Sequence, residues 1–214
     1  HFRRSREPAA LPARARAHWE PDTPGYHFLL GMHAFGLEEC GQYAQAEAAG
    51  RRSVALNPED HWGTHAVAHV IEMQGRHREG IAWLDGLQGH WGGCNDFINH
   101  LWWHRTLYHL ELEQFDRVLA LYDEHVRTGR LDFYLVMHNA TSLLWRLELC
   151  GVDVGGRWAE LERYALERVH DHANPFSDMH YAFALTANGR DDAVGEHLAS
   201  LRQDACRRPG SWAP

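Results

Sequence analysis

The sequence predicts an all-α protein built from about five helix pairs arranged in series. Glycine or Asn-Pro stands at each expected helix junction, as at Asn57-Pro58, Asn174-Pro175 and Gly189. Gly75 follows Gly41 by 34 residues (75 − 41), a spacing typical of helical repeats. The chain has no run of alternating β-branched residues bounded by turns, and such runs are the usual signal of strands. Together these observations favour helices throughout.

The individual elements follow a repeating pattern of two helices. In GQYAQAEAAGRRSVALNP (Gly41 to Pro58), glycine ends one helix, an aromatic residue follows, Ala46 is small, and proline closes the second helix. The next unit, GRHREGIAWLDGL, begins at Gly75 and has the small residue Gly80 at the place of Ala46. This pattern resembles the tetratricopeptide repeat, in which stacked pairs complete one continuous core. The expected architecture is therefore a tetratricopeptide-type α-α superhelix, a right-handed solenoid.

The repeat pattern also predicts the domain organisation. Residues 1–24 contain four of the eight prolines and no sustained apolar period, so they are expected to form a leader or capping segment. Residues 25–206 are expected to form the helical repeat domain, with an insertion, GVDVGG, at 151–156, and residues 207–214 a C-terminal tail. Because the first residue is His rather than Met, we expect the chain to be part of a longer reading frame.

The amino-acid composition restricts the kinds of molecule that the protein is expected to bind. The net charge is −8, and the 21 basic residues are scattered rather than gathered in a stripe, so no nucleic-acid partner is expected. No apolar run reaches the roughly 18 residues of a membrane helix, so no membrane partner is expected. The four cysteines form no C-x-x-C pair and are interpreted as reduced thiols, although spacing alone leaves two disulfides open. These features favour a cytoplasmic protein, and a homo-oligomer is compatible with them.

Several longer strings are more distinctive than the repeat positions. GYHFLLGMHAFGLEECGQYAQAE, HAVAHVIEMQGR, NHLWWHRTLYHLE and SLLWRLELCG together resemble the tetratricopeptide repeat protein 38 family. The resemblance runs through most of residues 25–205. It implies a helical-repeat fold, and it implies no particular activity, substrate or cofactor.

The repeat register predicts which residues line a concave groove. In a solenoid of this type the first helix of each pair faces the groove, and its inward positions collect histidine, tryptophan and carboxylate side chains. His65, His69 and Glu72 also share one helical face by their spacing. The ligand-binding residues predicted in this way are Trp62, His65, His69, Glu72, His100, Trp103, His104, His138, Thr141 and Trp145.

A divalent metal site is the most specific hypothesis for the role of these histidines. His65 and His69 present two imidazoles on one helix face, and stacking of the first helices is expected to bring His100 and His138 near them. The residue after His65 is Ala66, so the Glu of an H-E-x-x-H protease is missing. The alternative is that the histidines are ordinary polar groups, bonded to backbone carbonyls or to Glu38, Glu72 and Glu148. No cofactor is predicted apart from this candidate metal.

Two functions fit such a groove. The first is a helical-repeat binding protein that holds a peptide, a protein segment or a small-molecule ligand among the histidines and tryptophans. The second is a metal-dependent or acid/base enzyme that uses His65, His69, His100 and His138. The sequence identifies no catalytic residue, and whether the protein is an enzyme stays open at this point. An open groove favours the first function, and a compact pocket favours the second.

Overall fold

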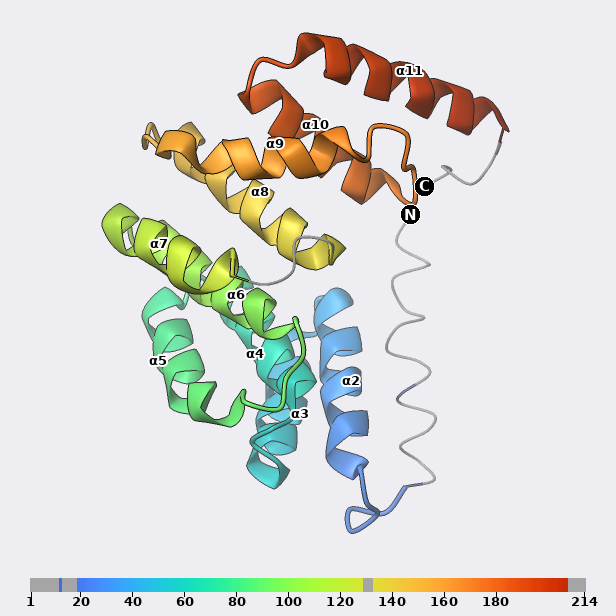
Figure 1. Cartoon of the computed structure of the whole chain (residues 1–214). Coiled ribbons are helices and arrows are strands. Elements are labelled where there is room, and N and C mark those ends of the chain that lie inside the picture. Colours follow the sequence, from blue (N-terminus) through green and yellow to red (C-terminus); the bar gives the residue numbers. More distant parts are fainter. Residues whose placement is uncertain (1–11, 13–18, 129–132, 208–214) are drawn as a thin grey trace. The chain divides into compact units, whose positions relative to one another are not determined.

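The computed structural model describes residues 12, 19–128 and 133–207, and all the regular elements in these ranges are helices (Figure 1). The prediction of an all-α protein is confirmed for this part of the chain. Most of the predicted leader and tail lies outside the described residues. The chain divides into two compact units, His1–Leu112 and Glu113–Pro214, and the predicted repeat domain extends over both.

From residue 19 onward, the described part of the first unit is formed by five helices and one short 3-10 turn. They are α2 (Tyr26–Glu39), α3 (Tyr43–Leu56), α4 (His61–Met73), α5 (His77–Leu87), the 3-10 turn η2 (Gln88–His90) and α6 (Ile98–Glu111). Helix α2 packs against α3 and α4, and α4 also contacts α5 and α6 (Figure 1). Helix α4 is therefore central to this unit, and its fully buried Val67 and Ile71 belong to the main apolar core.

The described part of the second unit also consists of helices and short helical turns. They are α7 (Phe115–Leu121), the π turn η3 (Tyr122–Val126), α8 (Tyr134–Leu149), the 3-10 turn η4 (Gly155–Arg157), α9 (Trp158–Leu166), α10 (Pro175–Ala187) and α11 (Asp191–Arg207). Helix α10 contacts α8, α9 and α11. Helix α7 continues directly into the π turn η3, and the predicted insertion at 151–156 contains the first two residues of η4.

The turn between paired helices repeats one backbone conformation. Gly41, Gly75, Gly151 and Gly189 have φ between +66° and +76°, the left-handed region that glycine adopts readily at helix C-termini. The equivalent turn after α6 places Glu113 in this conformation, with φ +56°, the only non-glycine with positive φ among the described residues. The recurring glycine therefore has a conformational cause at four of these five turns.

Side-chain caps fix two of the helix starts that the sequence predicts. The Asp60 carboxylate accepts a hydrogen bond from the backbone N–H of Gly63 at 3.0 Å and caps α4. The Asn174 side chain accepts from the N–H of Ser177 at 2.9 Å, and Pro175 occupies the first turn of α10. These caps set where α4 and α10 begin.

Gly80 allows α5 and α6 to approach closely. A Cβ atom at Gly80 would lie 2.4 Å from the ring of Tyr108, closer than any side-chain carbon can approach. The Tyr108 hydroxyl, on the same fully buried side chain, donates to the carbonyl oxygen of Ala68 at 2.7 Å. Tyr108 therefore joins α6 to both α5 and α4.

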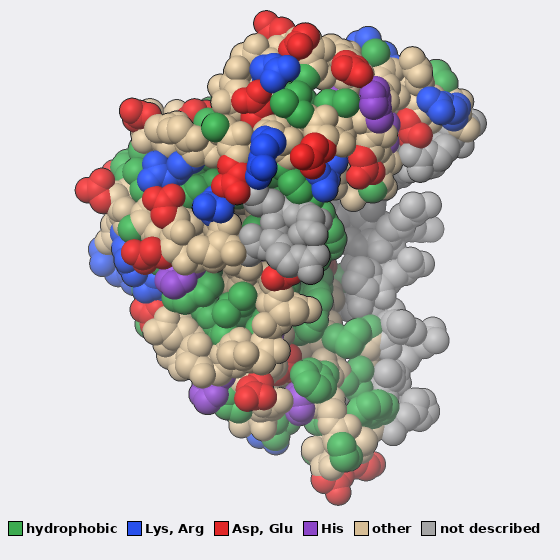
Figure 2. Space-filling view, viewed as in Figure 1, with side chains coloured by type: hydrophobic (Ala, Val, Ile, Leu, Met, Phe, Trp, Pro, Cys, Tyr) green, Lys and Arg blue, Asp and Glu red, His purple; other side chains and the backbone are tan. Residues whose placement is uncertain are grey.

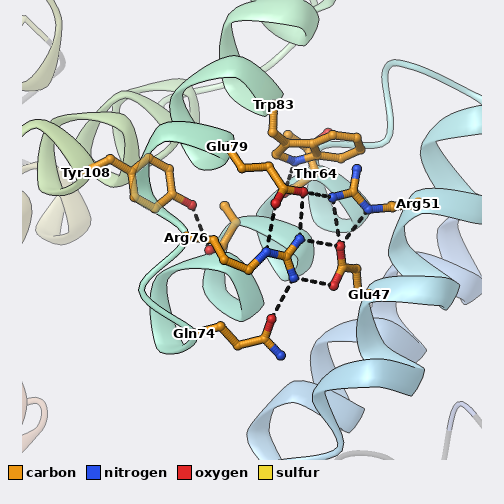
Figure 3. A network of polar contacts seen from close by, with 9 residues as sticks. Glu47, Arg51, Thr64, Gln74, Arg76, Glu79, Trp83 and Tyr108 are labelled. Atoms are coloured by element: carbon orange, nitrogen blue, oxygen red, sulfur yellow. Dashed lines mark hydrogen bonds and ion pairs between the residues drawn. The ribbon is translucent and has the colours of Figure 1, made fainter.

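A network of charged side chains covers the junction of α3, α4 and α5 on the surface (Figure 3). The Arg76 guanidinium donates to Glu47 at 2.8 Å and to Glu79 at 2.6 and 2.8 Å, and Arg51 donates to the same two carboxylates. The hydrogen bond from Arg76 lowers the pKa of Glu47 to about 2. Because the arginines are partly exposed, each pair contributes at most about 1 kcal/mol.

Within the described ranges, no helix combines the length and apolar character that crossing a bilayer requires. The four cysteines are present as free thiols.

Candidate metal centre

Two helices of the first unit each carry a pair of histidines one turn apart. His65 and His69 lie on α4, and His100 and His104 lie on α6. Because residues four apart share a helical face, and because α4 and α6 pack together, the four imidazoles meet between these helices. The Nε2 atom of His65 lies 2.9 Å from Nε2 of His69 and 3.0 Å from Nε2 of His100, which lies 3.2 Å from Nε2 of His104.

Hydrogen bonds alone cannot satisfy these three contacts. In a neutral imidazole Nε2 carries either one hydrogen or one lone pair, and a hydrogen bond needs one of each. The nitrogens form a chain in which His65 and His100 each take part in two contacts. Whichever way the hydrogens are placed, at most two of the three contacts can be linear hydrogen bonds. A cation between the nitrogens satisfies all four lone pairs.

Carboxylates face the outer nitrogens of two of these rings. His104 Nδ1 lies 3.0 Å from Oε2 of Glu72, so Nδ1 carries the hydrogen and Nε2 the lone pair. His69 Nδ1 lies 3.8 Å from Oε2 of Glu38. Metal-bound histidines commonly donate their second ring N–H to a carboxylate, which orients the ring and raises its basicity. Glu72 therefore has the position of a supporting group rather than of a direct ligand, whereas Glu38 lies beyond hydrogen-bond distance of His69.

Burial keeps these imidazoles neutral. His65 and His104 are nearly inaccessible, at 4% and 1% exposure, and burial and neighbouring histidines lower the pKa of both. Burial, with a smaller contribution from His100, lowers the pKa of His69 to about 4. At neutral pH these three rings are therefore unprotonated, which is the state that binds a metal. Burial also raises the pKa of Glu38 to about 7, with a further contribution from Glu39.

Aromatic rings surround the more accessible side of the cluster. The Phe35 ring lies 5.4 Å from that of His65 and 5.8 Å from that of His69, and Phe97 lies 5.1 Å from His65. Trp62, which is 45% exposed, packs 5.7 Å from His65, while Trp103 stacks on His100 at 5.2 Å. Beside these rings is a pocket of about 250 Å³ lined by Pro12, Met32, Phe35, Gly36 and Trp62.

The remaining predicted site residues lie on α8 in the second unit. The His138 ring packs 5.0 Å from Phe176 and 4.5 Å from His180, and burial lowers its pKa to about 3. Thr141 is fully buried, and Trp145 is 39% exposed and stacks on Phe183. In place of His138, the fourth histidine beside His65, His69 and His100 is His104. Glu148 accepts a hydrogen bond from Trp158 rather than from a histidine.

A second polar cluster in this unit was not predicted from the sequence. His172 Nδ1 lies 2.7 Å from Oδ1 of Asp178, and its Nε2 lies 2.8 Å from Oγ of Ser200. His197 faces a carbonyl oxygen with each ring nitrogen, that of Val169 at 2.9 Å and that of Asp178 at 3.2 Å. A neutral imidazole has one N–H, so only one of these contacts is a hydrogen bond and the other ring nitrogen keeps its lone pair. The ligand atoms of His172, Asp178 and His197 lie within 4.8 Å of one another, and these residues form a second group with metal-ligand chemistry. This cluster ties the segment after α9 to α10 and α11.

No family model matches the sequence, and no solved structure matches the chain. The functional argument therefore depends on the geometry of the four-histidine cluster.

Proposed function

We propose that this protein binds a divalent transition-metal ion through the Nε2 atoms of His65, His69, His100 and His104. The observation that carries the proposal is the convergence of four nitrogens whose mutual contacts hydrogen bonds cannot satisfy. A tetrahedral ion with metal–nitrogen bonds of about 2.0–2.1 Å separates its ligand nitrogens by roughly 3.3 Å. The three contacts, 2.9 to 3.2 Å, need only a small expansion to reach that spacing.

The ligand set favours particular ions. Imidazole nitrogen suits zinc, copper, nickel and iron, whereas magnesium and calcium prefer oxygen ligands. Glu72 and Glu38 stand at the outer nitrogens, so the direct ligands are neutral and the ion keeps its full charge toward any further ligand. A metal of this kind polarises a bound carbonyl or lowers the pKa of a bound water. Four histidine ligands fill a tetrahedral ion, so a metal-dependent enzyme requires the ion to take a fifth ligand. Of the two predicted functions, the metal-dependent enzyme is the one that the cluster supports better.

The expected superhelical fold and the expected family are both compatible with the proposed metal site. The five left-handed turn residues, at intervals set by the helix pairs, support a tetratricopeptide-type superhelix. The strings HAVAH and LWWH, on which the resemblance to the tetratricopeptide repeat protein 38 family depends, contain His65, His69 and His104. Membership of that family is accordingly part of the proposal. The free thiols support a cytoplasmic location.

The pocket beside the cluster favours a second candidate function. Met32 and Trp62 are about half exposed, and with Phe35 they line an apolar concavity of about 250 Å³ (Figure 2 shows apolar side chains at the surface along α2). Without a metal, such a site would hold an apolar side chain of a peptide or protein, or a small molecule. In this alternative the histidines would act as polar anchors.

Metal content separates the two functions. The purified protein is reconstituted with zinc, desalted and measured by inductively coupled plasma mass spectrometry, together with a His65→Ala/His100→Ala variant. We expect about one ion per chain in the wild type and a near-complete loss in the variant, because it lacks two of four ligands. A His61→Ala/His90→Ala variant is the matched control, since both residues lie outside the cluster in the same unit.

Far-ultraviolet circular dichroism checks that each variant keeps its helices. A wild-type protein without metal after reconstitution, or a folded His65→Ala/His100→Ala variant that keeps its metal, would overturn the proposal. Either result would leave ligand binding in the apolar pocket as the better function.

A further inference from the structure

An apolar pocket adjoins the proposed metal centre, and its size restricts what it can hold. Its volume is about 250 Å³, and its walls are Pro12, Met32, Phe35, Gly36 and Trp62. A cavity of about 150 Å³ is enough to hold benzene. The pocket therefore has room for one aromatic ring and a few more atoms, and it is too small for a folded segment of another protein.

Two side chains belong both to the pocket and to the surroundings of the histidines. Phe35 lines the pocket and also contacts His65 and His69, with ring centroids 5.4 and 5.8 Å apart. Trp62 lines the pocket and contacts His65 in an edge-on arrangement at 5.7 Å. A molecule seated in the pocket is therefore in contact with two rings that themselves contact histidines of the proposed site.

The direction of approach follows from burial. His65 and His104 are closed off from solvent, at 4% and 1% exposure, whereas the side chain of His69 is 28% exposed. His65 and His69 both contact Phe35 of the pocket, and of these two only His69 is partly exposed. His69 therefore gives an added ligand an approach to the ion next to the pocket, and His100 is the other partly exposed histidine of the cluster.

The net charge of the ion and its four ligands indicates which chemical group would bind to the ion. Four imidazoles bring no negative charge, so a divalent ion among them attracts an anionic donor. Oxygen anions such as carboxylate or hydroxamate can supply this charge, and none of the five described residues that line the pocket is charged. The ligand should thus combine an anionic oxygen head with an apolar body.

We propose that the metal ion takes, as a further ligand, a small molecule with an anionic oxygen donor and a single-ring apolar body that occupies the pocket of Met32, Phe35 and Trp62. This inference depends on the proposed metal-binding function, because the donor head binds the ion.

The test compares two probes that share one metal-binding head. Acetohydroxamate and benzohydroxamate are titrated into the cobalt(II)-loaded protein, and binding is followed by the visible absorption of cobalt. The cobalt content is measured before and after each titration. We expect benzohydroxamate to bind at least about tenfold more tightly, because its phenyl ring is removed from water in the pocket.

A pair of matched variants locates the apolar body. Met32→Lys places a charged side chain in the pocket wall, and Met73→Lys makes the same change at an exposed position outside the pocket. Met32→Lys should abolish the preference for benzohydroxamate and keep both the cobalt content and the affinity for acetohydroxamate. Met73→Lys should behave as the wild type.

The outcomes separate this inference from the proposed function. If cobalt is bound but the two hydroxamates bind equally, or if Met32→Lys keeps the preference, the pocket inference is wrong and the metal site stands. If the wild-type protein holds no cobalt, the proposed metal site is wrong, and this inference fails with it.

Discussion

His104 Nδ1 lies 3.0 Å from Oε2 of Glu72, and this contact joins α6 to α4 directly behind the four-histidine cluster. His104 is 1% exposed, so the partner of its Nδ1 decides which ring nitrogen keeps the lone pair. With Glu72 as acceptor, the hydrogen stays on Nδ1 and the lone pair of Nε2 is directed at the other histidines.

Replacing Glu72 by Gln should weaken metal binding without removing any direct ligand. The amide lacks the negative charge that raises the basicity of His104, and losses of about 10- to 100-fold are typical of such changes. Competition with a coloured zinc chelator measures the affinity. Glu111→Gln, at the exposed end of α6, is the matched control and should bind as the wild type. An unchanged affinity in Glu72→Gln would show that this carboxylate does not support the site.

Of the five turn residues with positive φ described above, Glu113 is not a glycine, although its backbone conformation favours glycine. Its φ of +56° resembles those of the four turn glycines, and a non-glycine side chain in this region is strained by about 1 kcal/mol. Glu113→Gly should therefore raise the free energy of unfolding by about 0.5–1 kcal/mol. Urea unfolding followed by circular dichroism measures it. Ala48→Gly, at an exposed position inside α3, should instead destabilise by about 1 kcal/mol, and the same sign for both would refute the explanation.

The sequence predicted the helices and part of the histidine cluster for physical reasons that are local. Glycine at the turn after α2 and Asn-Pro before α10 are signals carried by neighbouring residues, and they fall where the helices end or begin. The same local spacing placed His65 and His69 on one face. Such signals require no knowledge of how distant helices pack.

The place of His104 in the cluster depends on how α4 packs against α6, which are distant elements in the sequence. His104 was among the predicted ligand-binding residues, but the fourth metal ligand was assigned to His138, which has the same register position as His100 on the next first helix. The spacing that relates His65 to His69 also relates His100 to His104, and applying it there would have placed His104 in the predicted histidine cluster. The cluster of His172, Asp178 and Ser200 had no such signal, because its members come from a loop and two helices.

The contact between Gly80 and Tyr108 predicts opposite effects for two equivalent substitutions in α5. Gly80→Ala forces a methyl group into the Tyr108 ring, and overpacking of this kind costs about 1–3 kcal/mol. At Gly86 a Cβ meets nothing within 4 Å, so Gly86→Ala should stabilise by up to about 1 kcal/mol. Thermal unfolding of both variants measures the difference. Equal shifts for the two would contradict the packing of Tyr108 on α5.

The burial of His138 predicts a dependence of stability on pH. Burial, aided by His180, lowers the pKa of His138 from 6.5 to about 3, so between these values the unfolded chain binds a proton that the folded chain does not. The free energy of unfolding is therefore at its full value above pH 6.5 and falls as the pH is lowered toward 3. By pH 5 the loss from this residue is roughly 2 kcal/mol, at about 1.4 kcal/mol per pKa unit.

Replacing His138 by a residue that cannot be protonated should remove this loss of stability at low pH. His138→Gln cannot take up the proton, so its free energy of urea unfolding should change less than that of the wild type between pH 7 and pH 5. The comparison is of slopes, so a constant packing cost of the substitution cancels. His170→Gln is the control, because that side chain is 64% exposed and reaches solvent in the folded protein as well. If His138→Gln and the wild type lose equal stability over this range, His138 takes up its proton in the folded protein too, and its burial does not depress its pKa.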